Sequence, residues 1–212
     1  MSEVKQNTKK KSIQDPFKIV LKTNSKQIAS KTASTLGGIP FVPKSLDFAR
    51  DISGQILPLF CQINFADMPA IQGFPSSGLF QLYITDSSDD CGYDEVVGDD
   101  IVIRFLKPEQ LLEEAKDMSE YDETKYSWMM EEPDAKNLVG IKAAYKAKAA
   151  HTIGGKPNFT QSPEYTDYIN FLQFDSEDGV MIGDCGIMHI FIKKEDLEEL
   201  NFEKAIFYFD CC

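Results

Sequence analysis

One short segment carries the residue types that nucleophilic catalysis would need. In Gly183-Asp184-Cys185-Gly186, backbone N–H groups around a cysteine could form an oxyanion hole, and a histidine could act as the base. Cysteine proteases with such a loop place the base far upstream and follow the nucleophile with a long stretch of barrel. Here His151 lies only 34 residues before Cys185, and only 27 residues follow Cys185. The sequence favours a structural turn, and a hydrolase that uses Asp184 or Cys185 is the alternative.

Histidines and acidic residues could hold a metal ion, but their spacing does not support a site. His151 and His189 are the two histidines of the chain, which is too few for a metal centre at this separation. The acidic run from Asp86 to Glu95 could bind calcium, yet an EF-hand loop needs glycine at its sixth position, where Cys91 stands. We therefore expect a solvated acidic loop, no metal and no cofactor.

The cysteines and the charge balance indicate the compartment and exclude several partners. The five cysteines form no CxxC pair, which is typical of reduced thiols in a cytosol. The formal net charge of -12 repels phosphate backbones and anionic lipids, so we expect no nucleic acid and no membrane partner. No apolar run approaches the length of a membrane span, and the N-terminal residues contain no apolar signal segment. We expect a cytoplasmic protein.

The elements that position these residues follow a pattern that occurs twice. Four segments of the first half match four segments of the second half, in the same order and at offsets that fall from 117 to 104 residues. Loops tolerate insertions, which explains the change in offset, and an internal duplication is the economical explanation. The matched pairs are Thr35–Pro40 with Thr152–Pro157, Phe60–Asn64 with Phe171–Asp175, Gly78–Ile84 with Gly186–Ile192, and Ile101–Phe105 with Ala205–Phe209.

Each unit begins with a Gly-Gly-x-Pro turn, continues with a strand that carries glutamine, and ends with two apolar strands. The runs IVIRFL and AIFYF predict strands buried on both faces. Before the first unit, Phe17–Lys22 predicts a strand, and residues 1–15 predict a disordered tail. Helices are predicted at Glu109–Lys116, Ala135–Ala150 and Glu195–Leu200.

These elements predict an α+β fold that is predominantly β, with two homologous β-rich halves packed about a pseudo-twofold axis. The first half covers residues 34–106, a helical link covers 107–150, and the second half covers 151–212. Residues 16–212 are expected to form a single domain.

The motifs resemble those of the YwqG-like family, a bacterial family of unknown function. The resemblance rests on LGGIPFVP at Leu36–Pro43, LPLFCQINFADMP at Leu57–Pro69 and FPSSGLFQLYI at Phe74–Ile84. In the second half it is carried by IGGKPNFTQ, FLQFDSE, MIGDCGIMHIFI and FYFDC. The resemblance covers nearly the whole chain from about Phe17 onward. It implies an internally duplicated fold and brings no established catalytic residues.

Four polar residues at matching places in the two halves are the first candidate binding site. Gln62 and Asn64 share one strand face, and Gln173 and Asp175 occupy the equivalent positions. Pseudo-symmetry could gather them in a central cleft. Alternatively, the glutamines cap buried backbone groups, because polar side chains in a core must be hydrogen-bonded.

Acidic residues near aromatic residues form the second candidate site. Trp128, Tyr121 and Tyr126 lie within an acidic part of the link, and exposed aromatic side chains rimmed by charge are typical of protein-binding sites. We expect a non-enzymatic binding protein whose partner is a basic protein, such as a toxin or nuclease that it restrains. The sequence specifies no oligomeric state. The acidic residues are Asp86, Asp89, Asp90, Asp94, Glu95, Asp99 and Asp100, then Glu120, Asp122, Glu123, Glu131, Glu132 and Asp134.

Overall fold

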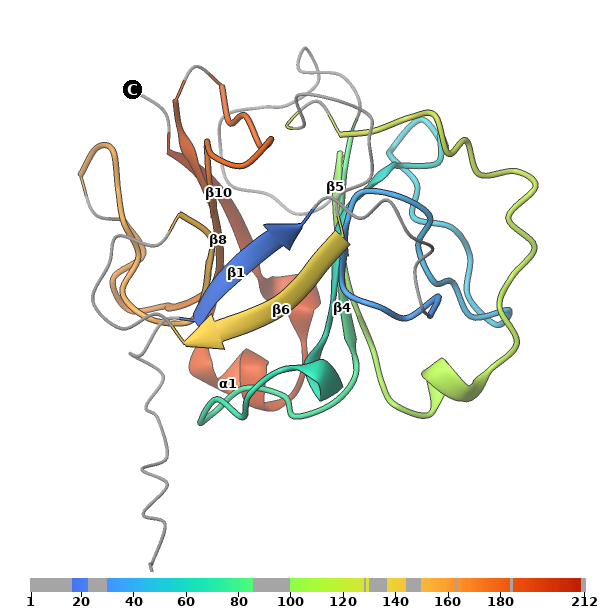
Figure 1. Cartoon of the computed structure of the whole chain (residues 1–212), viewed down its shortest axis with the longest axis horizontal. Coiled ribbons are helices and arrows are strands. Elements are labelled where there is room, and N and C mark those ends of the chain that lie inside the picture. Colours follow the sequence, from blue (N-terminus) through green and yellow to red (C-terminus); the bar gives the residue numbers. More distant parts are fainter. Residues whose placement is uncertain are drawn as a thin grey trace, which may run out of the picture.

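The computed structural model describes residues 17–22, 30–85, 100–127, 129, 137–143, 150–162, 164–183 and 185–210. In these residues the chain forms two antiparallel sheets and little helix (Figure 1), which confirms the mainly β prediction. The smaller sheet contains β2 (Thr35–Leu36), β3 (Leu59–Asn64), β4 (Leu79–Ile84) and β5 (Ile101–Leu106), in that order. The larger sheet has the order β10 (Ile206–Asp210), β9 (Ile187–Ile192), β8 (Ile169–Asp175), β7 (Thr152–Ile153), β1 (Phe17–Lys22) and β6 (Asn137–Ala143).

The helical elements are short and lie at the ends of strands. They are the α-helix α1 (Lys194–Glu198) and the 3₁₀ turns η1 (Phe65–Asp67), η2 (Gln110–Leu112) and η3 (Phe202–Lys204). In the described residues no helix is long enough to cross a membrane, because α1 spans only five residues.

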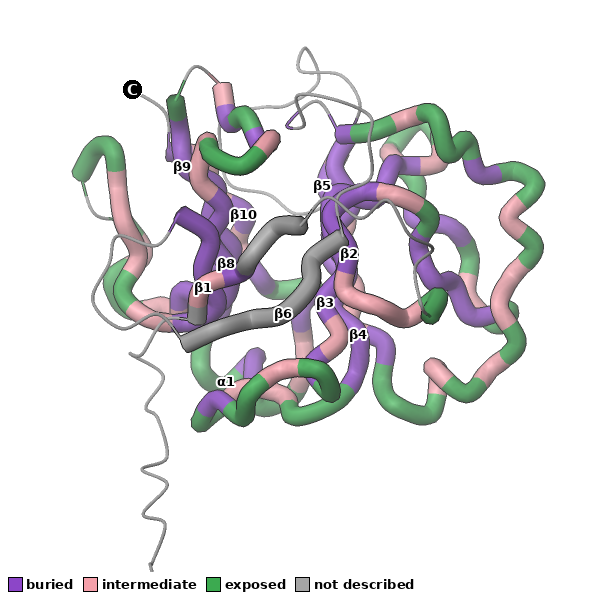
Figure 2. Tube along the Cα trace, in the orientation of Figure 1, coloured by how far each residue is buried: buried purple, intermediate pink, exposed green. Residues whose placement is uncertain are grey.

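Aromatic side chains from both sheets meet in one core. Phe60 of β3 packs edge-on against Phe174 of β8, with ring centroids 5.0 Å apart. Phe80 of β4 lies 5.0 Å from Phe171 of β8, and Phe202 of η3 contacts both of these rings. Figure 2 shows that buried residues are concentrated along the two sheets. The inner faces of both sheets are therefore buried against each other.

The strands that are buried on both faces are the central ones. Every residue of β4 and of β9 is buried. By contrast, β5 and β10 contain several half-buried residues and lie at the edges of their sheets, so the prediction that IVIRFL and AIFYF are buried on both faces is wrong. An edge strand has a neighbour on one side only, and its apolar residues cover part of the core while the others remain accessible.

The strands of the two halves follow the same order and register. β2-β3-β4-β5 and β7-β8-β9-β10 are both consecutive antiparallel sets, and both have a register irregularity at the start of the second strand. Thr35 pairs with Gln62 just as Thr152 pairs with Gln173. The Gly-Gly turns also agree, with φ of 68° and 80° at Gly37 and Gly38 and 67° and 79° at the matching pair. Positive φ at successive positions favours glycine, which explains why both turns carry it.

The described part of the link between the halves contains no α-helix. Within the predicted helix Ala135–Ala150, residues Asn137–Ala143 form strand β6, which pairs with β1. Val139 and Ile141 favour a strand and Gly140 disfavours a helix, so the Ala and Lys content was a poor guide. β1 was predicted correctly, and its pair with β6 crosses in front of the core in Figure 1.

The other predicted helix in the link, Glu109–Lys116, is reduced to the single turn η2. The residues that follow η2 pair with an earlier loop instead. The N–H of Lys116 donates to the carbonyl of Val42 at 2.8 Å, and the N–H of Lys44 donates to the carbonyl of Glu114 at 2.9 Å. These backbone contacts hold the segment in an extended form. The third predicted helix agrees with α1 within one or two residues.

Candidate functional site

Gln62 is a buried hydrogen-bonding centre on the outer face of the smaller sheet. Its Nε2 donates to the carbonyls of Lys31 and Ala33 at 3.0 and 2.8 Å. Its Oε1 accepts the N–H of Phe41 at 3.2 Å and the Nε2–H of Gln81 at 3.1 Å. One side chain thus joins the backbone before the Gly-Gly turn to the backbone after it, and every polar atom of the amide has a partner.

Gln173 does the same in the second half. Its Nε2 donates to the carbonyl of Ala150 at 3.3 Å, and its Oε1 accepts the N–H of Asn158 at 2.9 Å. Ala150 and Asn158 match Ala33 and Phe41 at the offset of 117 residues. These contacts have the form of the backbone caps that were the alternative to a binding cleft.

The four candidate polar residues are not gathered in a central cleft. Gln62 and Gln173 lie on the outer faces of different sheets, and the aromatic core separates those faces because side chains alternate along a strand. Asn64 donates to the carbonyl of Thr32 and accepts the N–H of Ala66, both at 3.0 Å. Asp175 accepts the N–H of Ser176 at 2.8 Å. None of these hydrogen bonds joins Gln62 or Asn64 to Gln173 or Asp175.

Both histidines are buried. His151 Nδ1 accepts the N–H of Asp175 at 3.2 Å, and its ring packs on Phe174 with centroids 5.0 Å apart. Burial lowers the pKa of His151 to about 4, although Asp178 opposes part of this shift. Burial likewise lowers the pKa of His189 to about 4, opposed by Asp210. Both rings are therefore neutral at pH 7.

Cys185 is exposed in the turn that precedes β9, whereas Asp184 lies outside the described residues. The described contacts of His151 and His189 are with strand backbone and aromatic rings. Neither histidine is therefore placed to act as a base for the thiol of Cys185. Gly186 closes the turn by donating to the carbonyl of Ile182 at 2.6 Å.

Cys61 is buried, and burial raises its pKa strongly. Among the described residues, no three His, Cys, Asp or Glu side chains are grouped to hold a metal.

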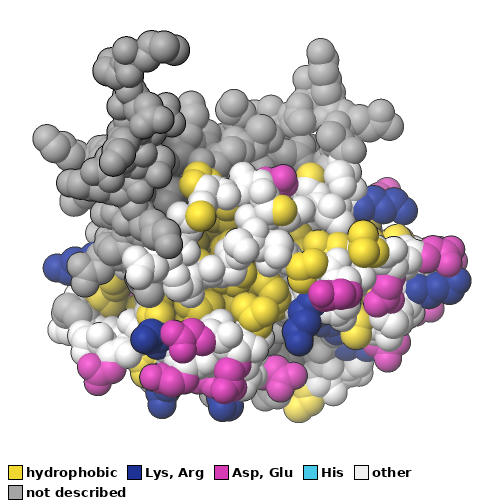
Figure 3. Space-filling model, turned by 90° about the horizontal axis from the view of Figure 1, so that it is seen from below, with side chains coloured by type: hydrophobic (Ala, Val, Ile, Leu, Met, Phe, Trp, Pro, Cys, Tyr) yellow, Lys and Arg dark blue, Asp and Glu magenta, His cyan; other side chains and the backbone are white. Residues whose placement is uncertain are grey.

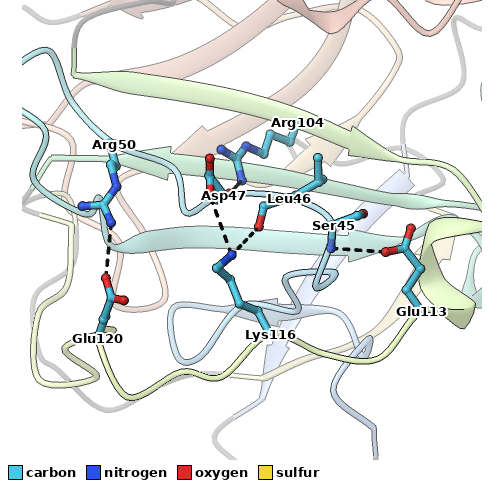
Figure 4. A network of polar contacts seen from close by, with 8 residues as sticks. All are labelled: Ser45, Leu46, Asp47, Arg50, Arg104, Glu113, Lys116 and Glu120. Atoms are coloured by element: carbon cyan, nitrogen blue, oxygen red, sulfur yellow. Dashed lines mark hydrogen bonds and ion pairs between the residues drawn. The ribbon is translucent and has the colours of Figure 1, made fainter.

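A layer of loops covers the outer face of the smaller sheet and carries the acidic surface. Figure 4 shows the polar contacts that fix this layer. Arg104 of β5 donates to the carbonyl of Asp47, and Lys116 donates to the carbonyl of Leu46 at 2.9 Å. Arg50 pairs with Glu120 at 3.4 Å. Residues 44–50 are thereby tied both to the sheet and to residues 113–120.

Tyr121 anchors the acidic part of this layer. Its side chain is 9% exposed, and its hydroxyl accepts the N–H of Leu59 at 2.9 Å and donates to the carbonyl of Gly38 at 3.3 Å. Burial raises the pKa of Tyr121 to about 12, so the phenol keeps its proton. The prediction of an exposed aromatic residue is wrong for Tyr121 but fits Tyr126, which is 37% exposed. Trp128 lies outside the described residues.

Two neighbouring hollows open on the surface around Tyr121. The larger, here called the acidic hollow, has a volume of about 420 Å³ and combines apolar and acidic side chains. The second, of about 280 Å³, shares Asp122 with it. Exposed hydrophobic side chains lie beside acidic and basic ones on this side of the molecule, at the right of Figure 3. The acidic hollow is lined by Ile39, Asp117, Met118, Ser119, Tyr121, Asp122 and Glu123.

Two of the three carboxylates of the acidic hollow are held by local hydrogen bonds. Asp122 accepts the hydroxyl of Thr124 at 2.6 Å and its N–H at 3.0 Å, and these bonds lower the pKa of Asp122. Asp117 accepts the N–H of Ser119 at 3.0 Å. Ile39, at the edge of the hollow, is 45% exposed. The hollow suits a group with an apolar stem and a positive head, such as a lysine or arginine side chain.

Only part of this site was visible in the sequence. Glu120, Asp122 and Glu123 were singled out there, and all three are exposed. The other acidic candidates of the link, Glu131, Glu132 and Asp134, lie outside the described residues, as does the acidic run up to Asp99. Ile39 had no signal of its own, because it lies far from Tyr121 in the sequence and reaches the hollow only through folding.

Replacing Tyr121 by phenylalanine tests the anchor. Loss of the hydroxyl leaves the buried N–H of Leu59 without its partner, which costs about 1–3 kcal/mol. We expect this loss in the free energy of unfolding measured with urea. The matched change Tyr126→Phe removes a hydroxyl from an exposed ring and should change stability by less than about 0.5 kcal/mol. Equal values for the two variants would show that Tyr121 is no anchor.

A sequence model of one protein family, described as "Domain of unknown function (DUF1963)", matches residues 34–211. No curated protein matches the chain. The match covers β2 to β10 and therefore both glutamine-centred halves and the acidic hollow.

Proposed function

The chain belongs to the family described as Domain of unknown function (DUF1963), and we propose that it binds a basic segment of another protein at the acidic hollow and catalyses no reaction. The motifs that resemble the YwqG-like family lie within the matched residues, which supports membership of that group. The common strand order and the equivalent glutamine contacts support an origin of the two halves by duplication. The free thiol of the buried Cys61 and the lack of any CxxC pair support a cytoplasmic location.

One observation carries the binding proposal, namely that the acidic hollow joins apolar side chains to carboxylates. Ile39 and Met118 would contact the methylene groups of a lysine or arginine, while Asp122 and Glu123 would face its charge. The net charge of -12 would speed the approach of a basic partner, and binding would weaken as salt rises. A basic toxin or nuclease that the protein restrains is a partner of this chemistry.

The test uses octalysine as a probe, with octaglutamate as the negative control. We expect the triple variant Asp117→Asn, Asp122→Asn and Glu123→Gln to bind labelled octalysine at least about tenfold more weakly in low salt, measured by fluorescence anisotropy. A matched variant neutralises three exposed carboxylates near α1 and should bind within about twofold of the unaltered chain. Its changes are Glu195→Gln, Glu199→Gln and Glu203→Gln.

Both variants lose three of the charges that make up the formal -12. Equal weakening in the two would show that octalysine responds to overall charge and would contradict the proposed site. The change Ile39→Ser separates the apolar contribution, because it leaves every carboxylate in place. Binding that is insensitive to Ile39→Ser would contradict the role given to the apolar side of the hollow.

A further inference from the structure

A short segment of the second half lies over the outer face of the larger sheet and is held by side chains from three strands. This cover segment comprises residues 156–162. Gln173 of β8 accepts the N–H of Asn158 at 2.9 Å, and Asp210 of β10 accepts the N–H of Thr160. Between these contacts, the ring of Phe159 stacks on His189 of β9, with centroids 5.1 Å apart.

The matching segment of the first half is held differently. There Gln62 accepts the N–H of Phe41, and Gln81, the counterpart of His189, donates to the carbonyl of Phe41 at 2.8 Å. On β5, Arg104 donates to the carbonyl of Asp47. Amides and a guanidinium do not change charge between pH 4 and pH 8, whereas an imidazole does. In both halves a glutamine of the sheet holds a backbone N–H of the covering segment, but only the second half adds a group that can change its charge.

The attachment of the second cover has unpaired polar atoms at its centre. His189 is 0% exposed, and in the described structure neither ring nitrogen has a hydrogen-bond partner. Oδ1 of the buried Asp210 has no partner either. Buried polar atoms without partners favour any rearrangement that hydrates them. Displacing Phe159 would allow this and would uncover the ring of His189 and the parts of Phe191 and Tyr208 that Phe159 contacts.

We propose that the cover segment is an acid-released flap, which opens as the pH falls and exposes His189 together with the parts of Phe191 and Tyr208 that Phe159 covers. Tyr165, outside the segment, keeps its own contacts with Phe191 and Tyr208. The groups that face His189 are Asp210 and Tyr208 on β10, Gln173 on β8, Phe159 of the cover and Phe191 on its own strand. Asp210 is the anion among them. It attracts a proton to His189, but burial opposes protonation more strongly while the cover is closed.

The sign of the pH dependence follows from the two states of His189. Burial lowers the pKa in the closed state to about 4, whereas a hydrated imidazole has a pKa of about 6.5. Between these values the open state binds more protons, so opening becomes more favourable as the pH falls from 6.5 towards 4. At pH 5 the equilibrium constant for opening should be about 20-fold larger than at pH 7.

Hydrogen exchange of three amides in the full chain tests the flap. We expect the protection factors of Asn158 and Thr160 to fall about 20-fold between pH 7 and pH 5, after correction for intrinsic exchange. The N–H of Phe41 is held by Gln62 in the equivalent place and serves as an internal control. Its protection factor should stay well above those of Asn158 and Thr160 at both pH values, because only global unfolding exposes it.

The variant His189→Gln introduces the residue of the first half and should remove the pH dependence at Asn158 and Thr160. Persistence of the dependence in His189→Gln would overturn the proposal, because another group would then control opening. Equal protection factors for Phe41, Asn158 and Thr160 at pH 5 would also overturn it, because all three amides would then exchange through global unfolding. Unchanged protection of Asn158 and Thr160 in the unaltered chain would be equally decisive against a flap.

Discussion

Replacing Gly78 by alanine is expected to lower the free energy of unfolding by about 3–4 kcal/mol. Gly78 has a φ of +103°, a backbone angle that residues with a Cβ atom rarely adopt. A Cβ atom there would lie 2.6 Å from the ring of Phe105 and 2.8 Å from the carbonyl oxygen of Leu106. The unfavourable backbone conformation is a local cost. The close contacts of the Cβ atom add a second cost, because they force β5 away from the start of β4. Urea unfolding would measure the sum of the two.

Gly54→Ala separates these two contributions. Gly54 has φ of +87°, but a Cβ atom added there meets nothing within 4 Å. We expect this variant to lose only the cost of the backbone conformation, about 1 kcal/mol. If both variants lost the same amount, close packing of Gly78 on β5 would not be a determinant of the fold.

The second large effect is a loss of stability in mild acid. His151 and His189 both have pKa values lowered to about 4 by burial, against 6.5 in the unfolded chain. The unfolded chain therefore binds more protons between these values, and stability falls as the pH decreases from 6.5 towards 4. At pH 4.5 the two residues together should reduce the free energy of unfolding by about 5 kcal/mol relative to pH 7.

The first half of the chain supplies the control substitutions for this prediction. Ser34 and Gln81 occupy the places that match His151 and His189. Ser34 already accepts the N–H of Asn64 at 2.9 Å, as His151 accepts that of Asp175 at 3.2 Å. In the double variant His151→Ser and His189→Gln, unfolding should depend on pH much less between 4.5 and 7. The slope is the readout, because the smaller serine also leaves a cavity. An unchanged slope would assign acid sensitivity to other groups.

The sequence predicted the strands well because apolar periodicity and the Gly-Gly turns act locally. It failed at the link, where the Ala and Lys content of residues 135–150 predicted helix and pairing with β1 selected strand β6 instead. Helix propensity is weak beside a continuous ladder of backbone hydrogen bonds. Gln62 and Gln173 were recognised as special, yet their partners became known only from the loops that pass over them.

The acidic hollow shows a different limit of sequence reasoning. Asp122 and Glu123 could be identified from the sequence because they belong to a run of closely spaced acidic residues. The burial of Tyr121 depends on Leu59 and Gly38, which lie 62 and 83 residues away. No local pattern encodes such contacts, so an aromatic residue expected at the surface proved to be an anchor.

The position of β1 affects how the chain folds while it is being made. β1 pairs with β6 and β7, and Asn137, the first residue of β6, follows Lys22 by 115 residues. At roughly 5–20 residues per second, a ribosome needs roughly 6–23 s to reach those partners after completing β1. The smaller sheet, by contrast, is made of consecutive strands and can pair as it emerges. The segment FKIVLK of β1 therefore has no native strand to pair with until β6 has been made. A chaperone that shields this segment would act during that time.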